Sequence, residues 1–220
     1  MDYLPAVVAV VVMGVAGILD LLYREIEPLY WFYATLLGGL AYLKTHGGLL
    51  GQAEPILLGL ALAPALVMAG LYAAGLMGGA DVLAMVFLSL AYPLAPGSLL
   101  PVPVLAILYA SPLSVAHRIW MLCRVVRGPR CLVSGRIRVP GYRLLSDPRL
   151  RWWLVSDKRA GGLDVGGETW EIVAKLGPRE PVEATPGLPY VTHLAAGTIL
   201  AVILGDDPVL GLVELLAGRG

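Results

Sequence analysis

Two aspartates border long apolar segments, and they are the residues of this 220-residue chain best suited to chemistry. Asp20 closes the first apolar segment, and Asp81 follows Gly78, Gly79 and Ala80 at the start of a later one. A carboxylate near hydrocarbon costs at least ~2.5 kcal/mol at the bilayer centre, so it indicates function by default. Two carboxylates held together share a proton, which lets one act as base and the other as acid. The pattern therefore predicts a catalytic dyad.

Each aspartate also has an ordinary structural interpretation. Asp20 and Arg24 are four residues apart and would share a helical face, which fits a simple ion pair at the membrane edge. Asp81 would lie at the cap or first turn of its helix, where unpaired backbone amides favour any carboxylate. Neither motif decides between these interpretations by itself.

The composition places both acids in a membrane protein. The chain is 58% hydrophobic and only 15% charged, whereas soluble domains carry about 25% charged residues. The apolar residues form long uninterrupted runs, which predict six membrane-spanning helices. We expect them at residues 3–22, 29–43, 55–77, 81–94, 98–119 and 188–205. The short apolar run 209–217 cannot span, and we expect it at the outer surface.

The distribution of basic residues predicts the orientation. Thirteen of the sixteen Lys and Arg lie between Arg118 and Arg179, and the positive-inside rule assigns that block to the cytoplasm. The N-terminus then lies outside, and Asp20 and Asp81 reach the same depth on the cytoplasmic side. This coincidence favours a shared site over two separate structural roles.

Three regions follow from these boundaries. Residues 1–122 hold the first five transmembrane helices, residues 123–187 form a soluble cytoplasmic domain, and residues 188–220 hold the sixth helix and a short outer tail. The predicted fold is an all-α polytopic membrane protein with a small cytoplasmic α+β or β-rich domain. In that domain the alternation around Ile137 and Val139 predicts a strand, and residues 169–176 fit a strand or a short helix. Its acids and bases are interleaved, which argues against nucleic-acid binding and fits a solvated face near anionic lipid.

No metal site or cofactor is expected. Cys123 and Cys131 form no Cys-x-x-Cys pair, so no zinc ribbon can be built from them. In the cytoplasm we expect both as reduced thiols. His193, inside the last apolar segment, either faces the dyad or hydrogen-bonds a neighbouring helix.

Two motifs resemble a known family. The pattern Asp20-x-x-x-Arg24-x-Ile26 after a first span, and the GGAD turn (residues 78–81) opening a fourth, are similar to those of archaeal preflagellin (prearchaellin) peptidases and type IV prepilin peptidases. These are GxGD-type membrane aspartyl proteases. The stretch 185–190 followed by Gly197 resembles the family's final span. The likeness covers nearly the whole chain by layout but only three short stretches by motif.

The resemblance implies specific roles. Asp20 and Asp81 match the two catalytic aspartates, while Arg24 and the GGAD turn support them. Ala80 replaces the third motif glycine, which archaeal members often accept, and Leu83 stands where many members carry a lysine.

The implied activity is cleavage of basic leader peptides from archaellin or pilin-like precursors at the cytoplasmic face of the cell membrane, without a cofactor. A helix dipole disfavours an anion at a C-terminus and favours one at an N-terminus. We therefore expect Asp81 as the base and Asp20 as the initial acid, although Arg24 opposes this order. The alternatives are a small ion-coupled transporter with both aspartates as ion ligands, or a non-enzymatic assembly scaffold. A transporter predicts inverted repeats, and no convincing repeat is visible.

Overall fold

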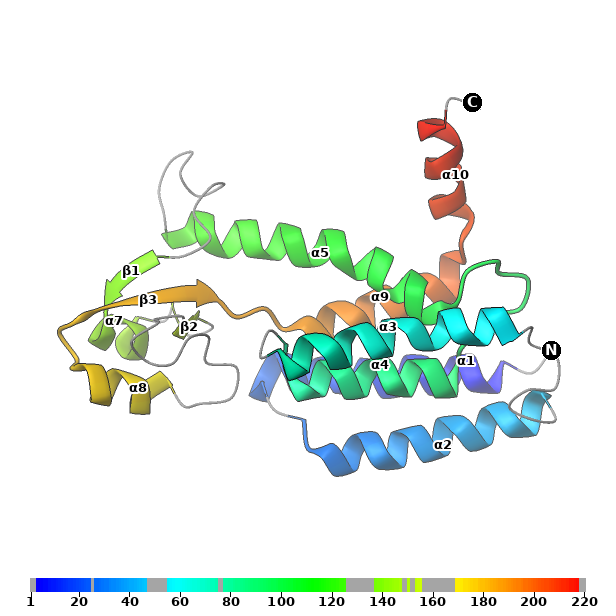
Figure 1. The fold of residues 1–220 in the computed structure, drawn as a ribbon, viewed down its shortest axis with the longest axis horizontal. Helices are drawn as coiled ribbons and strands as arrows, with labels where there is room; N and C mark the ends of the chain where they lie inside the picture. Colours follow the sequence, from blue (N-terminus) through cyan, green and yellow to red (C-terminus); the bar gives the residue numbers. More distant parts are fainter. Residues whose placement is uncertain are drawn as a thin grey trace. The chain divides into compact units, whose positions relative to one another are not determined.

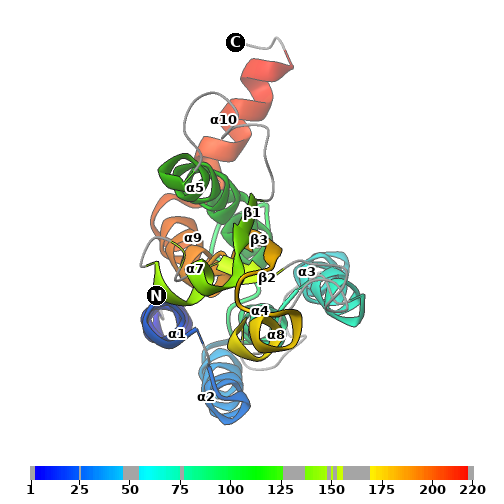
Figure 2. The same ribbon diagram turned by 90° about the vertical axis from the view of Figure 1, so that its left-hand side faces the viewer.

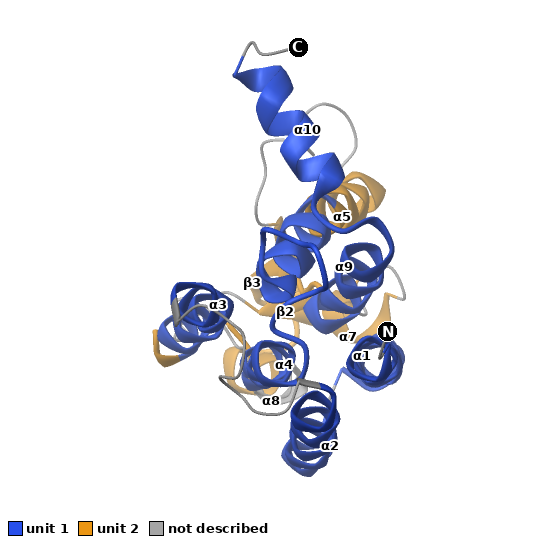
Figure 3. Ribbon diagram, turned by 90° about the vertical axis from the view of Figure 1, so that its right-hand side faces the viewer, with its two compact units in different colours: residues 1–72, 79–112, 189–220 blue, residues 73–78, 113–188 orange. Residues whose placement is uncertain are grey.

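A computed structural model describes residues 3–24, 26–46, 55–74, 77–125, 137–147, 150, 153–155 and 169–217. The chain divides into two compact units, coloured separately in Figure 3. Residues 1–72, 79–112 and 189–220 form the first, here called the helical unit. Residues 73–78 and 113–188 form the second, called the mixed unit.

The helical unit is a bundle around α1. Its elements are α1 (Leu4–Tyr23), α2 (Pro28–His46), α3 (Pro55–Ala73), α4 (Gly79–Ala91), the first part of α5 (Val102–Val125), α9 (Tyr190–Leu204) and α10 (Asp207–Leu216). Helix α1 packs against α9, α2 and α4, and α4 also packs against α2 and α9. The C-terminal end of α1 and the N-terminal ends of α4 and α9 lie at the same end of this bundle (Figure 1).

Three of the described helices are long and apolar enough to cross a membrane: Leu4–Tyr23, Ile56–Ala73 and Val102–Val125. Helices α4 and α9 are apolar but shorter. The predicted mostly helical, membrane-associated chain with a small sheet region is therefore confirmed in outline. That six helices span the membrane, and which side of the membrane each loop faces, stay predictions.

Prolines explain why the fifth helix begins later than predicted. We expected it from residue 98, but α5 starts at Val102, between Pro101 and Pro103. Proline has no backbone N–H and restricts the residue before it, so helices start and stop around it. The Val102 amide instead donates to the Pro93 carbonyl at 3.0 Å, which closes the turn between α4 and α5.

Some glycines of the helical unit lie at close helix contacts, whereas Gly59 and Gly70 of α3 do not. A Cβ added to Gly59 or Gly70 would meet no atom within 4 Å. A Cβ at Gly17 of α1 would lie 2.8 Å from the Ala195 Cβ of α9, and one at Gly197 of α9 would collide with the Ala106 carbonyl of α5. Helix α9 is therefore closely packed on two sides through glycine, as small residues allow in membrane bundles.

The mixed unit contains the small sheet. Strand β3 (Pro181–Pro186) lies between β1 (Ile137–Pro140) and β2 (Trp153–Val155), and both pairings are antiparallel. Helices α7 (Gly141–Ser146) and α8 (Thr169–Leu176) accompany the sheet, as Figure 2 shows. The strand predicted around Ile137 and Val139 is confirmed, and residues 169–176 are a helix. The core comes from alternating strand positions and the inner face of α8, including Val139, Val155, Val173, Val182 and Ala184.

One prediction about this unit is wrong. Cys123, near the end of α5, is disulfide-bonded rather than a free thiol. Cys131 lies outside the described residues. The expectation of thiols rested on a general rule about redox compartments.

Candidate active site

Helical periodicity turns Asp20 into the bundle. The buried side of α1 carries residues spaced three or four apart, namely Ala6, Ala9, Met13, Ala16 and Asp20. Large apolar side chains on the other side are exposed, namely Val7, Val11, Val15 and Ile18. Asp20 keeps only 9% of its surface exposed. A carboxylate on the buried face of an apolar helix needs hydrogen-bonding partners.

Helix α9 supplies these partners. The backbone amide of Thr192 donates to Asp20 Oδ2 at 3.1 Å, and the Thr192 hydroxyl lies 3.3 Å from the same oxygen. Amides in the first turn of a helix lack acceptors within the helix. Pro189, the N-cap residue of α9, makes no side-chain capping bond. Asp20 therefore caps the start of a helix 172 positions away in the chain.

This contact changes the predicted electrostatics of Asp20. From the sequence, the carboxylate lay only at the C-terminus of its own helix, where an anion is disfavoured. In the structure it also faces the N-terminus of α9, where amides favour an anion. Asp81 occupies the first turn of α4. Each aspartate therefore lies at the N-terminus of a helix, Asp20 at that of α9 and Asp81 at that of α4.

Arg24 lies outside the helical face that the sequence predicted for it. Helix α1 ends at Tyr23, and Arg24 takes the left-handed conformation with φ of 62° while its amide donates to the Asp20 carbonyl at 3.1 Å. This conformation costs an L-residue about 1–2 kcal/mol, and such strain is concentrated at functional sites.

Arg24 connects the two aspartates electrostatically. Burial lowers the pKa of the Arg24 guanidinium, and the charges of Asp20 and Asp81 both act to raise it. The cation is therefore within electrostatic reach of both carboxylates. Asp81 is half-buried and also acts on the phenol of Tyr190, the first residue of α9.

The GGAD turn is simpler than expected. Gly79 and Ala80 already belong to α4, and Gly78 directly precedes it. Among the described glycines, positive φ occurs at Gly97, Gly177 and Gly205 but not at Gly78 or Gly79. A Cβ on Gly79 would meet the Tyr72 ring at 3.6 Å, an ordinary contact. The turn therefore positions Asp81 without the special backbone angles that two glycines suggested.

Thr192 and Tyr190 belong to the site, and the sequence analysis missed both. Each is a polar residue in the first turn of an otherwise apolar helix, which was the available signal. His193 follows on the same helix and is buried, with 8% of its surface exposed. Leu83, at the position of the family lysine, is half-buried on α4.

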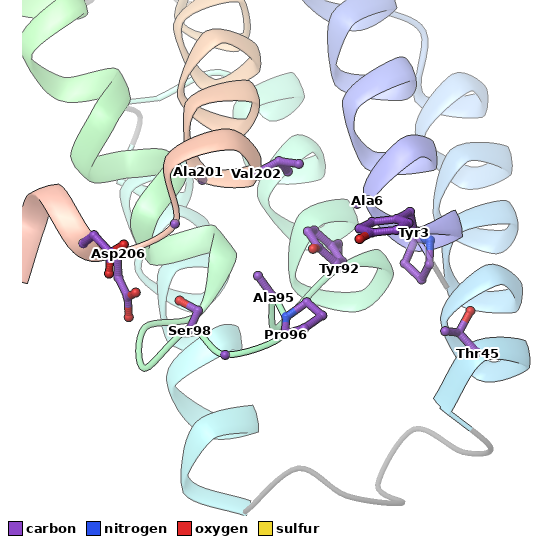
Figure 4. Close-up of a pocket in the computed structure, with 14 residues that line it drawn as sticks. Tyr3, Ala6, Thr45, Tyr92, Ala95, Pro96, Ser98, Ala201, Val202 and Asp206 are labelled. Carbon is purple, nitrogen blue, oxygen red and sulfur yellow. The ribbon is translucent and has the colours of Figure 1, made fainter. Parts of the chain in front are cut away.

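A separate cavity lies at the other end of the helical unit (Figure 4). It measures about 510 Å³, and its lining includes Tyr3, Tyr92, Ser98 and Asp206 but neither Asp20 nor Asp81. Asp206 Oδ2 accepts the amides of Leu99 and Leu100 at 2.6 and 3.2 Å. Burial raises the pKa of Asp206, but its hydrogen bonds outweigh burial and leave it below its ordinary value. Asp206 thus fixes the α4–α5 connection to the end of α9.

Comparison of the sequence with models of known protein families and with curated proteins finds no match. Within the described part of the chain, no three His, Cys, Asp or Glu side chains are grouped as a metal site would require. The groups at this site that can take part in chemistry are Asp20, Asp81, Arg24 and the first turn of α9.

Proposed function

We propose that this protein is a membrane aspartyl endopeptidase with Asp20 and Asp81 as its catalytic pair. The observation that carries the proposal is the packing of α1, which carries Asp20, against α4, which carries Asp81 in its first turn, and the charges of both carboxylates act on the Arg24 guanidinium. Asp20 on α1 and Asp81 on α4 are 61 positions apart in the sequence. The packing of α1 against α4 supports their meeting at one end of the bundle.

The mechanism follows from the charges. Two neighbouring carboxylates hold one proton between them, and the pair titrates as a unit. Arg24 offsets the single negative charge that remains. The ionised carboxylate takes a proton from water, which attacks the scissile carbonyl, while the protonated carboxyl donates to the carbonyl oxygen. Helix N-termini favour the anion of both acids, so helix dipoles do not separate base from acid here.

The substrate class is a precursor with a short basic leader and a long apolar helix, as in archaellins and pilin-like proteins. In the proposed topology six segments span the cell membrane with the N-terminus outside. The ends of α1 and α4 then lie at the cytoplasmic face, where leader and apolar helix meet. The precursor must be extended at the peptide bond that is cleaved.

The test uses membranes containing the full chain and a precursor of this type. Asp20→Asn and Asp81→Asn should each abolish cleavage while expression is maintained, and sequencing of the product's new N-terminus locates the cut. Asp207→Asn is the matched control, because Asp207 is exposed at the far end of the helical unit. Full cleavage by either dyad variant would remove that residue from the mechanism.

A further inference from the structure

The Thr192 hydroxyl has two acceptors but only one hydrogen. Its oxygen lies 2.8 Å from the Gly17 carbonyl and 3.3 Å from Asp20 Oδ2. A hydroxyl donates one hydrogen bond and accepts others through its lone pairs. The shorter distance identifies Gly17 as the acceptor, so Thr192 Oγ1 can serve Asp20 as an acceptor when Asp20 carries the proton.

We propose that Thr192 is a positioning residue whose hydroxyl changes its hydrogen-bond direction with the protonation state of Asp20. When Asp20 is neutral, the Thr192 hydroxyl donates to Gly17 and accepts the carboxyl proton. When Asp20 has given that proton away, the hydroxyl rotates and donates to Oδ2. Thr192 keeps its own hydrogen throughout, so the only proton transferred is the one that Asp20 loses.

The environment of Thr192 is specific to this role. Buried helical threonines commonly donate to a carbonyl one turn earlier in their own helix. Thr198 of α9 does so, with its hydroxyl 2.8 Å from the Leu194 carbonyl. Thr192 instead reaches across to α1. That reach depends on the close approach of α1 to α9 at Gly17, where an added Cβ would lie 2.8 Å from the Ala195 Cβ.

Other titratable groups lie near Asp20, and the signal of Asp20 has to be distinguished from theirs. Arg24 acts on Asp20 directly, and Asp81 acts on Arg24. Among the described residues, titratable groups near this end also include Tyr190 and His193 of α9, Tyr30 of α2, and Tyr23 and Glu27 beside Arg24. None of these groups changes when Thr192 is replaced, and subtracting the signal of an Asp20→Asn protein isolates the carboxyl group of interest.

The experiment is an infrared titration of the full chain in lipid vesicles, following the carbonyl band of the protonated Asp20 carboxyl. Thr192→Val removes the hydroxyl at nearly constant volume, and Thr192→Ser keeps it. The hydroxyl bonds both forms of Asp20, but its bond to the charged form is the stronger, so its loss should move the midpoint of the band to higher pH by about one unit. Thr192→Ser and the control Thr198→Val should titrate like the unmodified protein.

Precursor cleavage provides the second measurement. Thr192→Val should lower kcat about tenfold with little change in KM, and Thr192→Ser should restore it. If Thr192→Val does not fold, Thr192→Ala measured against Thr192→Ser makes the same comparison. An unchanged midpoint without the hydroxyl would overturn the inference, as would an equal shift in Thr192→Ser.

The catalytic role of Thr192 rests on the proposed function, whereas the infrared titration tests the hydroxyl switch without it. If the unmodified protein cleaves no precursor and Thr192→Val still shifts the midpoint, the peptidase assignment fails and the hydroxyl switch stands. If cleavage is intact and the midpoint does not move, the switch fails and the peptidase assignment stands.

Discussion

Replacing Gly17 of α1 with alanine should move Asp20 away from α9, the helix whose Thr192 amide bonds its carboxylate. The new Cβ would lie 2.8 Å from the Ala195 Cβ and 3.4 Å from the Thr192 Cα. Carbon atoms pack best at about 3.5–4.0 Å. Helices α1 and α9 must therefore move apart by about 1 Å.

The size of the effect follows from the hydrogen bonds at this interface. A movement of about 1 Å would stretch the 3.1 Å bond from the Thr192 amide to Asp20 beyond the range of a hydrogen bond. A misplacement of that size costs an enzyme about 100-fold in rate. Overpacking of this kind costs about 1–3 kcal/mol, which corresponds to roughly 2–12 °C in Tm for a chain of this length.

The assay measures precursor cleavage and thermal unfolding of the same Gly17→Ala preparation. Gly14→Ala is the matched control, since a Cβ at Gly14 of α1 would meet no atom within 4 Å. That control should keep full activity and at least the original Tm, because alanine favours helix over glycine by about 1 kcal/mol.

A second substitution separates crowding from other effects of Gly17→Ala. Ala195→Gly removes the methyl group that the new Cβ would meet, so the double variant should regain both Tm and activity. Full activity in Gly17→Ala alone would refute the argument that this close approach holds Asp20 in place. Failure of the double variant to recover would show that the Ala195 contact is not the cause.

Three further predictions concern other parts of the helical unit. Gly197→Val should lower Tm by several degrees in a thermal scan, because a Cβ there collides with the Ala106 backbone, whereas Gly70→Val faces open space and should not. Arg24→Gly should leave Tm unchanged or raise it, since glycine accepts φ of 62° without strain, but it should reduce cleavage because the cation on which both carboxylates act is lost. Asp206→Asn should cost about 1.5–3 kcal/mol at neutral pH in denaturation experiments. Because the folded state lowers the pKa of Asp206, its contribution is complete above its ordinary value of 3.8 and is lost as the pH falls further, so the difference from the Asn variant should shrink in acid.

Local signals predicted the elements but not their partners. Apolar runs located α1, α2, α3, α4 and α9 to within a few residues because helix formation depends on nearby sequence. The same runs gave no information about which helix Asp20 would face. Its bond to Thr192 spans 172 positions and exists only because α1 and α9 pack together.

One site prediction failed for a related reason. Arg24 was expected on the face of Asp20 because the two residues are four apart, but the helix ends one residue too early. Spacing rules hold only while a helix continues, and its last turn is the hardest part to predict. Close helix packing shows the same dependence on partners: Ala61 and Ala65 of α3 are buried, and a Cβ added at Gly17, Gly38 or Gly197 would crowd a neighbouring helix. Composition shows where close contact is possible, and the neighbouring helix decides where it occurs.

Helix α9 is fitted between α1 and α5 with no spare room, at Gly17 against Ala195 and at Gly197 against Ala106. Any side chain that thickens α9 must therefore displace one of these neighbours, and the displacement reaches the carboxylate that α9 caps. Substitutions meant to leave that fit intact would do better to begin on α3, where the side chains of Leu66 and Val67 are exposed.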